Sequence, residues 1–177
     1  RYSKISGCLW KSKKMKKIKI NKKKGILFWI TGLSGSGKTT FGKAIHKDIQ
    51  KLYGPTLMIS GDNIRKIFYL KGHTKEDRLK ILKSYCRFAK FITNQNINLI
   101  FAVVGMFNEP RKWNRQNINN YIEIYIKSNL KKIIKLKKKK IYHKKNIQDI
   151  VGVDIKPEFP KKPNIIITNS FDKTKQK

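Results

Sequence analysis

The sequence predicts an α/β fold with three layers, in which helices cover both faces of a parallel β-sheet. Short apolar segments alternate with amphipathic segments along residues 25–168, a pattern typical of parallel sheets. A glycine-rich segment, residues 32–37, joins the first apolar segment to the first amphipathic one. Hydrophobic residues make up 39% of the 177 residues, so the chain can form a packed core without disulfides or metals.

Each element follows from its own pattern. Five short apolar segments are predicted strands, because buried strands of a parallel sheet are apolar on both faces: Gly25–Thr31, Thr56–Ser60, Ile97–Val104, Tyr121–Ile126 and Asn164–Thr168. Four segments with apolar residues at helical spacing are predicted helices: Thr40–Tyr53, Lys75–Gln95, Arg111–Asn119 and Asn129–Leu136. Gly54-Pro55 ends the first of these helices.

We expect one folded domain, residues 25–170, between two basic ends. Residues 1–24 contain eleven basic and no acidic residues, and we expect them to form a disordered arm. Residues 171–177 form a basic tail. The chain has only two cysteines and no apolar run near the ~20 residues of a membrane span, so we expect a cytoplasmic protein with no membrane partner.

The net charge of +33 suggests a nucleic-acid-binding protein as an alternative class. Lysine supplies most of this charge, whereas proteins that read nucleic acids rely on arginine, which grips phosphates and guanine edges bidentately. The basic residues are also concentrated in residues 1–24 and 131–145. We therefore expect no specific nucleic-acid partner.

Residues 32–39, Gly-Leu-Ser-Gly-Ser-Gly-Lys-Thr, match the phosphate-loop motif G-x-x-x-x-G-K-[ST]. In such a loop the backbone N–H groups and the helix N-terminus face one anion. Lys38 would reach the β- and γ-phosphates of ATP, and Thr39 would bind Mg²⁺. The context, between a strand and a helix, predicts a P-loop NTPase fold. The guanine-specific Asn-Lys-x-Asp is absent, which favours a small kinase over a GTPase.

A second motif, Ser60-Gly-Asp-Asn-Ile-Arg65, ends the second predicted strand. The carboxyl ends of parallel strands carry the ligand site, so Asp62 should lie close to the phosphate loop. Asp62 could accept a hydroxyl proton or hold Mg²⁺, and Arg65 could clamp an anionic substrate. The alternative is that Asp62 or Asn63 caps a helix that begins at Ile64.

These two motifs, followed by Glu76-Asp77-Arg78, resemble the adenylylsulfate kinases, which use MgATP to phosphorylate the 3′-hydroxyl of adenosine 5′-phosphosulfate. Residues 152–163 align without gaps with the family's Gly-Ile-Asp-x-Pro-Tyr-Glu-x-Pro-x-x-Pro segment. The resemblance covers about Gly25–Thr168. It implies a small-molecule kinase of sulfate assimilation that acts on a nucleotide and is often a homodimer.

The motif and the resemblance together give the expected site. Lys38 and Asp62 are the expected catalytic residues, and Thr39 and Asp62 the expected Mg²⁺ ligands. The ATP site is expected to contain Gly32, Ser34, Gly35, Ser36, Gly37, Lys38, Thr39, Thr40 and, from a mobile lid, Lys139. The acceptor site is expected to contain Asp62, Asn63, Arg65, Arg78, Phe107, Arg111 and Arg115.

Several departures from the family pattern fall in the acceptor site. The family's Ile-Ser-Pro-Phe/Tyr-Arg reads Val104-Gly105-Met106-Phe107-Asn108 here, and Phe107 could stack on a base or belong to the core. His73 stands where the family has an aromatic residue, and Leu136 where the lid has an arginine. Residues 106–109 and 151–155 also resemble relatives from capsule and surface-glycan gene sets. Some of these relatives phosphorylate a cytidine-linked nucleotide such as cytidine diphosphoramidate, which is the alternative acceptor.

Overall fold

The computed structural model describes residues 20, 21, 23–136 and 149–171. Its strands are β1 (Ile26–Thr31), β2 (Thr56–Ser60), β3 (Asn98–Val103), β4 (Asn120–Lys127) and β5 (Ile165–Thr168). Its helices are α3 (Lys38–Tyr53), α4 (Gly61–Ile67), α5 (Lys75–Asn94), α6 (Asn108–Asn117) and α7 (Leu130–Lys135).

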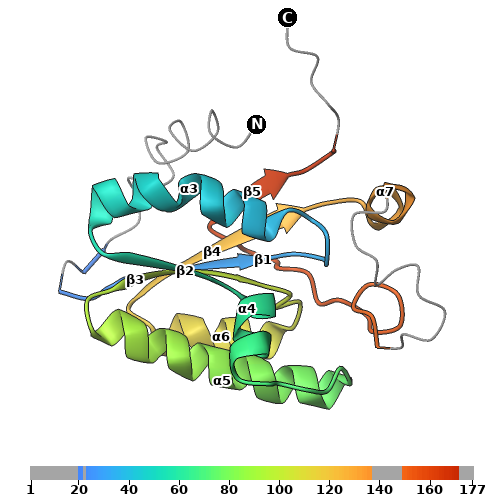
Figure 1. The fold of residues 1–177 in the computed structure, drawn as a ribbon, viewed down its shortest axis with the longest axis horizontal. Coiled ribbons are helices and arrows are strands. Elements are labelled where there is room, and N and C mark those ends of the chain that lie inside the picture. The colour runs from blue at the N-terminus through green and yellow to red at the C-terminus, as the bar shows by residue number, and fades with distance from the viewer. Residues whose placement is uncertain (1–19, 22, 137–148, 172–177) are drawn as a thin grey trace, which may run out of the picture.

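The five strands form one parallel sheet in the order β2-β3-β1-β4-β5. β1 lies at the centre, with Thr31 in register with Val103 of β3 and Tyr125 of β4. β2 is in register with β3 up to Ser60, so the carboxyl ends of β1, β2 and β3 meet at one edge of the sheet. The segments that leave these three ends therefore lie close together, as Figure 1 shows for the start of α3 and for α4.

Helices cover both faces of the sheet, as the sequence predicts. α3 packs on one face, and α5 and α6 pack on the other (Figure 1). Successive side chains of β1 point to opposite faces, so Phe28 packs with Phe41 of α3 while Trp29 packs with Phe101 and the α5 face. All six residues of β1 are buried, as expected for the central strand of such a sheet.

The predicted strands are confirmed within one or two residues. The predicted helices are also confirmed, but α3 begins at Lys38 and α6 at Asn108, each a few residues earlier than the apolar spacing indicates. The first turn of each helix carries the polar residues that follow a strand, so the apolar pattern starts only in the second turn. Helix α4 begins at Gly61 and not at Ile64.

The basic ends are described only in part. Residues 1–19 and 22 of the expected arm and residues 172–177 of the expected tail lie outside the described residues. The end of the arm contacts the domain: Asn21 N–H donates to Asn120 Oδ1 at 2.8 Å, and Asn120 Nδ2 donates to the carbonyls of Asn21 and Lys24. In the described part of the chain, no helix is long and apolar enough to cross a membrane.

Gly25, just before β1, offers a direct test of the packing. A Cβ at this position would lie 2.1 Å from the carbonyl oxygen of Ile97, a backbone atom that cannot move away cheaply. We expect Gly25→Ala to lower the free energy of unfolding by about 3 kcal/mol or more, measured by urea unfolding.

Gly61→Ala is the matched control for this variant. Gly61 has no positive φ, and the nearest atom to an added Cβ, Val103 Cγ1, would lie 3.6 Å away, which is an ordinary contact. We expect this change to alter the free energy of unfolding by less than about 1 kcal/mol. Equal losses in the two variants would contradict the packing at Gly25.

Candidate active site

The phosphate loop has the backbone geometry that the motif predicts. It runs from the end of β1 to the start of α3, and Gly37 at the N-cap of α3 has φ 96° and ψ 14°, a left-handed conformation that disfavours a side chain. Gly32 leaves no room for a Cβ, which would lie 2.7 Å from Ile126 O and 2.8 Å from Ser36 Oγ. The loop is therefore built around its glycines, and its backbone turns over the N-terminus of a sixteen-residue helix.

The residues expected to hold ATP lie together at this loop. Lys38 is 7% exposed, and its ammonium donates to the carbonyl oxygen of Leu33 at 2.7 Å, so the side chain folds back over the loop. Thr39 is half-buried and Thr40 exposed in the first turn of α3, while Ser34 and Gly35 are half-buried in the loop itself. Lys139, the expected contribution of the lid, lies outside the described residues.

Ser36 and Asn169 form a contact that the sequence did not predict. Asn169, just after β5, donates from Nδ2 to the carbonyl oxygen of Ser36 at 2.9 Å, across 133 positions of the chain, and both residues are buried. The hydroxyl of Ser36 is also buried, and among the described residues it has no hydrogen-bond partner. Asn169 thus fixes the loop from behind, and Ser36 keeps a donor that a phosphate oxygen can satisfy.

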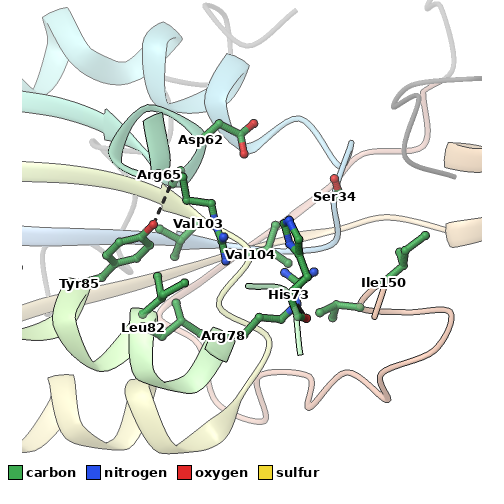
Figure 2. A pocket seen from close by; sticks show the side chains of 13 residues that line it. Ser34, Asp62, Arg65, His73, Arg78, Leu82, Tyr85, Val103, Val104 and Ile150 are labelled. Atoms are coloured by element: carbon green, nitrogen blue, oxygen red, sulfur yellow. Dashed lines mark hydrogen bonds between the residues drawn. The ribbon is translucent and has the colours of Figure 1, made fainter. Parts of the chain in front are cut away.

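Asp62 lies in the first turn of α4, close to the phosphate loop (Figure 2). The alternative of a helix cap at Asp62 or Asn63 is wrong: Ser60 is the N-cap, and its hydroxyl oxygen accepts the Asn63 N–H at 3.2 Å. The Ser60 hydroxyl also donates to Asn63 Oδ1, which holds the Asn63 side chain against the cap. Asp62 is therefore not the cap of α4, and its side chain is exposed.

A pocket opens between the phosphate loop, α4, α5 and the ends of β3 and the 149–151 segment. Its lining residues are Ser34, Gly61, Asp62, Arg65, His73, Arg78, Ile81, Leu82, Tyr85, Val103, Val104, Ile150 and Val151. Figure 2 shows Asp62 and Ser34 on the side of the phosphate loop and the cationic side chains of α4 and α5 further in. One wall is therefore charged and the other is apolar, as expected for a site that binds an anionic molecule with a ring.

Arg65 and Arg78, two of the expected acceptor residues, both line this pocket. Arg65 donates from Nη1 to the carbonyls of Leu70 and Gly72, at 3.2 and 3.0 Å. Arg78 donates from Nε to His73 O and from Nη2 to Asp149 O, each at 2.8 Å. Burial lowers the pKa of Arg78, and the charge of Arg65 lowers it further, so the two guanidinium groups repel each other. An anion between them would relieve this repulsion.

The structure corrects the expectation that Arg111 lies in the acceptor site, because it places this side chain in the interior. The side chain is 1% exposed. Its Nη1 donates to Gly105 O at 2.7 Å, and its Nη2 donates to Asn108 Oδ1 at 2.6 Å and Glu158 O at 2.7 Å. Its Nε lies 3.5 Å from Glu123 Oε1. Arg111 therefore joins the segment after β3 to residues 157–163 and does not line the pocket.

Arg115 and Phe107 also lie away from the pocket. Arg115 is paired with the fully buried carboxylate of Glu123, which also accepts the Tyr121 hydroxyl at 3.1 Å. Burial raises the pKa of Glu123, while Arg115 and Arg111 lower it. Phe107 is 1% exposed and belongs to the core on the α5 face, so the core alternative is confirmed for it. Glu123 was detectable in the sequence as the one acidic residue of a predicted buried strand.

The first turns of α3 and α4 carry oxygen-bearing side chains that suit Mg²⁺. Thr39 and Asp62 supply the hydroxyl and carboxylate oxygens that Mg²⁺ prefers, and a nucleotide phosphate usually supplies further ligands. Within the described ranges, no group of three or more His, Cys, Asp or Glu residues could hold a metal without such help. The Thr39 hydroxyl and the Asp62 carboxylate thus suit a metal ion that binds together with ATP.

The fold and the loop define the chain as a P-loop NTPase with a second, cationic pocket beside the loop. The family model described as adenylylsulphate kinase matches residues 24–168. The chain therefore belongs to the adenylylsulphate kinase family and is an ATP-dependent small-molecule kinase.

Two curated relatives and one solved structure support this assignment. A cytidine diphosphoramidate kinase from Campylobacter jejuni is 35% identical over 147 residues, which cover 81% of this chain and 86% of the relative. An adenylyl-sulfate kinase from Clostridium kluyveri is 31% identical over 157 residues, with 86% and 79% covered. The Mycobacterium tuberculosis APS kinase in complex with AMPPNP and APS has a TM-score of 0.75 over 82% of this chain and 88% of that chain, at 22% identity, and so shares the fold.

Asn169→Ala tests the support of the phosphate loop. Loss of one hydrogen bond of this kind costs about 1 kcal/mol, so we expect the KM for ATP to rise about fivefold. Steady-state kinetics measure this, with Thr168→Ala, an exposed neighbour on β5, as the control. An unchanged KM for ATP would mean that the loop holds its shape without Asn169.

Arg111→Met tests the correction for Arg111. The change leaves the carbonyls of Gly105 and Glu158 without a donor and the buried Glu123 with one arginine fewer. We expect the free energy of unfolding to fall by about 3 kcal/mol or more, measured by urea unfolding. Lys112→Met, an exposed neighbour, should change it by less than about 0.5 kcal/mol. Unchanged stability with a large rise in the acceptor KM would restore Arg111 to the acceptor site.

Proposed function

We propose that this kinase transfers the γ-phosphate of ATP to a ribose hydroxyl of a small anionic nucleotide bound in the cationic pocket. The observation that carries the proposal is that one pocket is lined by Ser34 of the phosphate loop, by Asp62, and by Arg65 and Arg78. Such a pocket can bring an acceptor hydroxyl, a carboxylate and the terminal phosphate of ATP together. Positioning and neutralisation of charge supply most of the rate in phosphoryl transfer.

Each residue would have one role in this reaction. The backbone of residues 32–37, with Lys38 and Thr40, would hold the phosphates of ATP, and Thr39 with Asp62 would hold Mg²⁺, which neutralises phosphate charge. Asp62 would accept the proton of the acceptor hydroxyl, since its carboxylate is exposed toward the pocket. Arg65 and Arg78 would bind the anionic part of the acceptor, with Asn63 at the rim of α4. Lys139 would add charge beside ATP.

Adenosine 5′-phosphosulfate is the first candidate acceptor, phosphorylated at its 3′-hydroxyl as in sulfate assimilation. The Gly-Asp-Asn-Ile-Arg and Glu-Asp-Arg segments support it, because their arginines line the pocket. The relative from Clostridium kluyveri, named an adenylyl-sulfate kinase, also supports it.

A cytidine-linked nucleotide such as cytidine diphosphoramidate is the second candidate. The relative from Campylobacter jejuni carries this activity in its name and is 35% identical over 147 residues. Residues 106–109 and 151–155, which resemble those of the relatives from capsule and surface-glycan gene sets, support it as well, and Val151 lines the pocket. Both candidates are ribose nucleotides, so the same catalytic residues would serve either.

The proposal requires two nucleotides as ligands, ATP and the acceptor, and no nucleic acid. We place the reaction in the cytoplasm, where ATP is supplied, and we expect a homodimer, which light scattering measures. Non-specific binding to polyanions would accompany the net charge of +33, and it should weaken steeply with salt.

A substrate panel with MgATP tests the proposal. Purified protein is incubated with adenosine phosphosulfate, with cytidine diphosphoramidate and with the free nucleosides, and the phosphorylated products are identified by mass spectrometry. We expect one of the two anionic nucleotides to be phosphorylated and the nucleosides to react poorly. Phosphorylation of neither nucleotide would contradict the proposal.

Two variants, Lys38→Ala and Asp62→Asn, test the roles proposed for these residues in phosphate transfer. Lys38→Ala should abolish transfer, and Asp62→Asn should lower kcat about 10²–10⁴-fold, the range for a lost general base. Asp48→Asn, on the α3 helix and outside the pocket, is the control. Full activity in Lys38→Ala would contradict the role of the phosphate loop.

A further inference from the structure

His73 is the third nitrogen-bearing side chain of the cationic pocket. It stands in the segment between α4 and α5, and its exposed imidazole lines the pocket beside Arg65 and Arg78. Figure 2 shows the three side chains converging on the same space. Thr74, not His73, caps α5, so the imidazole is not used as a helix cap.

The position of His73 is fixed by the same two arginines. Arg78 Nε donates to the carbonyl oxygen of His73 at 2.8 Å, and Arg65 Nη1 donates to the carbonyl of Gly72 at 3.0 Å. The segment carrying the imidazole is therefore held against the pocket by its backbone. The arginines place two permanent positive charges next to a group whose charge can change.

We propose that His73 is an acceptor-binding residue whose imidazole takes up a proton when the anionic part of the acceptor binds between Arg65 and Arg78. This inference rests on the proposed function, because it names the charge state in which the acceptor is bound.

The electrostatic surroundings of His73 support this coupling. Burial, and then the charges of Arg65 on α4 and Arg78 on α5, lower the pKa of His73 below its ordinary value. Asp149 and Asp77, the carboxylates that face it from the 149–151 segment and from α5, oppose this shift without overcoming it. The empty pocket therefore favours the neutral form of the imidazole. An acceptor phosphate or sulfate beside the ring would cancel the arginine charges and raise the pKa again.

The sign of the pH effect follows from this difference. The bound state has the higher pKa, so acceptor affinity increases as the pH falls through the bound-state pKa and stops increasing below the pKa of the empty pocket. Each unit of difference between the two pKa values increases affinity tenfold. Arg65 and Arg78 alone would bind the same anion with no such dependence, because arginine stays protonated throughout this range.

Kinetics of His73→Phe and His73→Gln test the proposal. For the acceptor that the panel identifies, we expect the wild-type KM to fall about three- to tenfold between pH 7.5 and pH 5.5, relative to both variants. The kcat and the KM for ATP should depend on pH in the same way in all three proteins. His46→Gln is the matched control, because His46 lies on α3 and bonds Thr56 O, away from the pocket.

Nuclear magnetic resonance measures the proton directly. The imidazole of His73 is titrated in the ADP-loaded protein, with and without inorganic pyrophosphate as an anionic probe. We expect the pKa of His73 to lie below its ordinary value without pyrophosphate and to rise when pyrophosphate is added. An unchanged pKa of His73, or a KM profile that His73→Phe preserves, would overturn the inference.

These outcomes separate the two proposals. If no nucleotide of the panel is phosphorylated, the proposed function fails, and the pyrophosphate titration still decides whether an anion loads a proton onto His73. If a nucleotide is phosphorylated and the pH profile is independent of His73, the proposed function stands and only the role of His73 is lost.

Discussion

The turn from β1 into α3 is the constraint on which the rest of the structure depends. Gly32 has no room for a Cβ between Ile126 and Ser36, and Gly37 starts α3 from a left-handed conformation. This turn leaves the central strand of the sheet, so its position is set by the register of β1 with β3 and β4. Asn169 extends the same constraint to the far edge of the sheet through its bond to Ser36 O. The position of the phosphate loop is thus set by the sheet behind it.

The acceptor pocket is stabilised in a different way, because its two arginines donate hydrogen bonds to backbone carbonyls of the protein itself. Arg65 and Arg78 bind carbonyl oxygens of residues 70–73 and of Asp149, and this fixes the pocket wall from two helices. Each guanidinium has five N–H donors, so both retain donors for an anion beyond those bonds. The buried Glu123, with Arg111 and Arg115, plays the corresponding structural role under the segment that follows β3. Arg65 and Arg78 therefore shape the pocket wall, whereas Arg111 and Arg115 support the segment that follows β3.

Most of the fold could be predicted from the sequence, because apolar periodicity indicates the strands. The phosphate loop was identified from its motif and from its place between a predicted strand and a predicted helix. Arg65 and Arg78, expected in the acceptor site, line the pocket, and their binding role stays a prediction. The positions of Arg111 and Arg115 could not be predicted, since they depend on contacts with Glu123 and Glu158, far away in the chain. The support by Asn169, 133 residues from Ser36, left no local signal.

The proposed reaction requires one nucleotide at the phosphate loop and a second in the pocket of Arg65 and Arg78, whose lining includes Asp62. A crystal structure with a non-hydrolysable ATP analogue and the identified acceptor would show where both molecules bind. We expect the γ-phosphate at Lys38, the anionic part of the acceptor between Arg65 and Arg78, and a ribose hydroxyl within hydrogen-bond distance of Asp62. An acceptor bound elsewhere, with its hydroxyl away from Asp62, would contradict the proposed reaction.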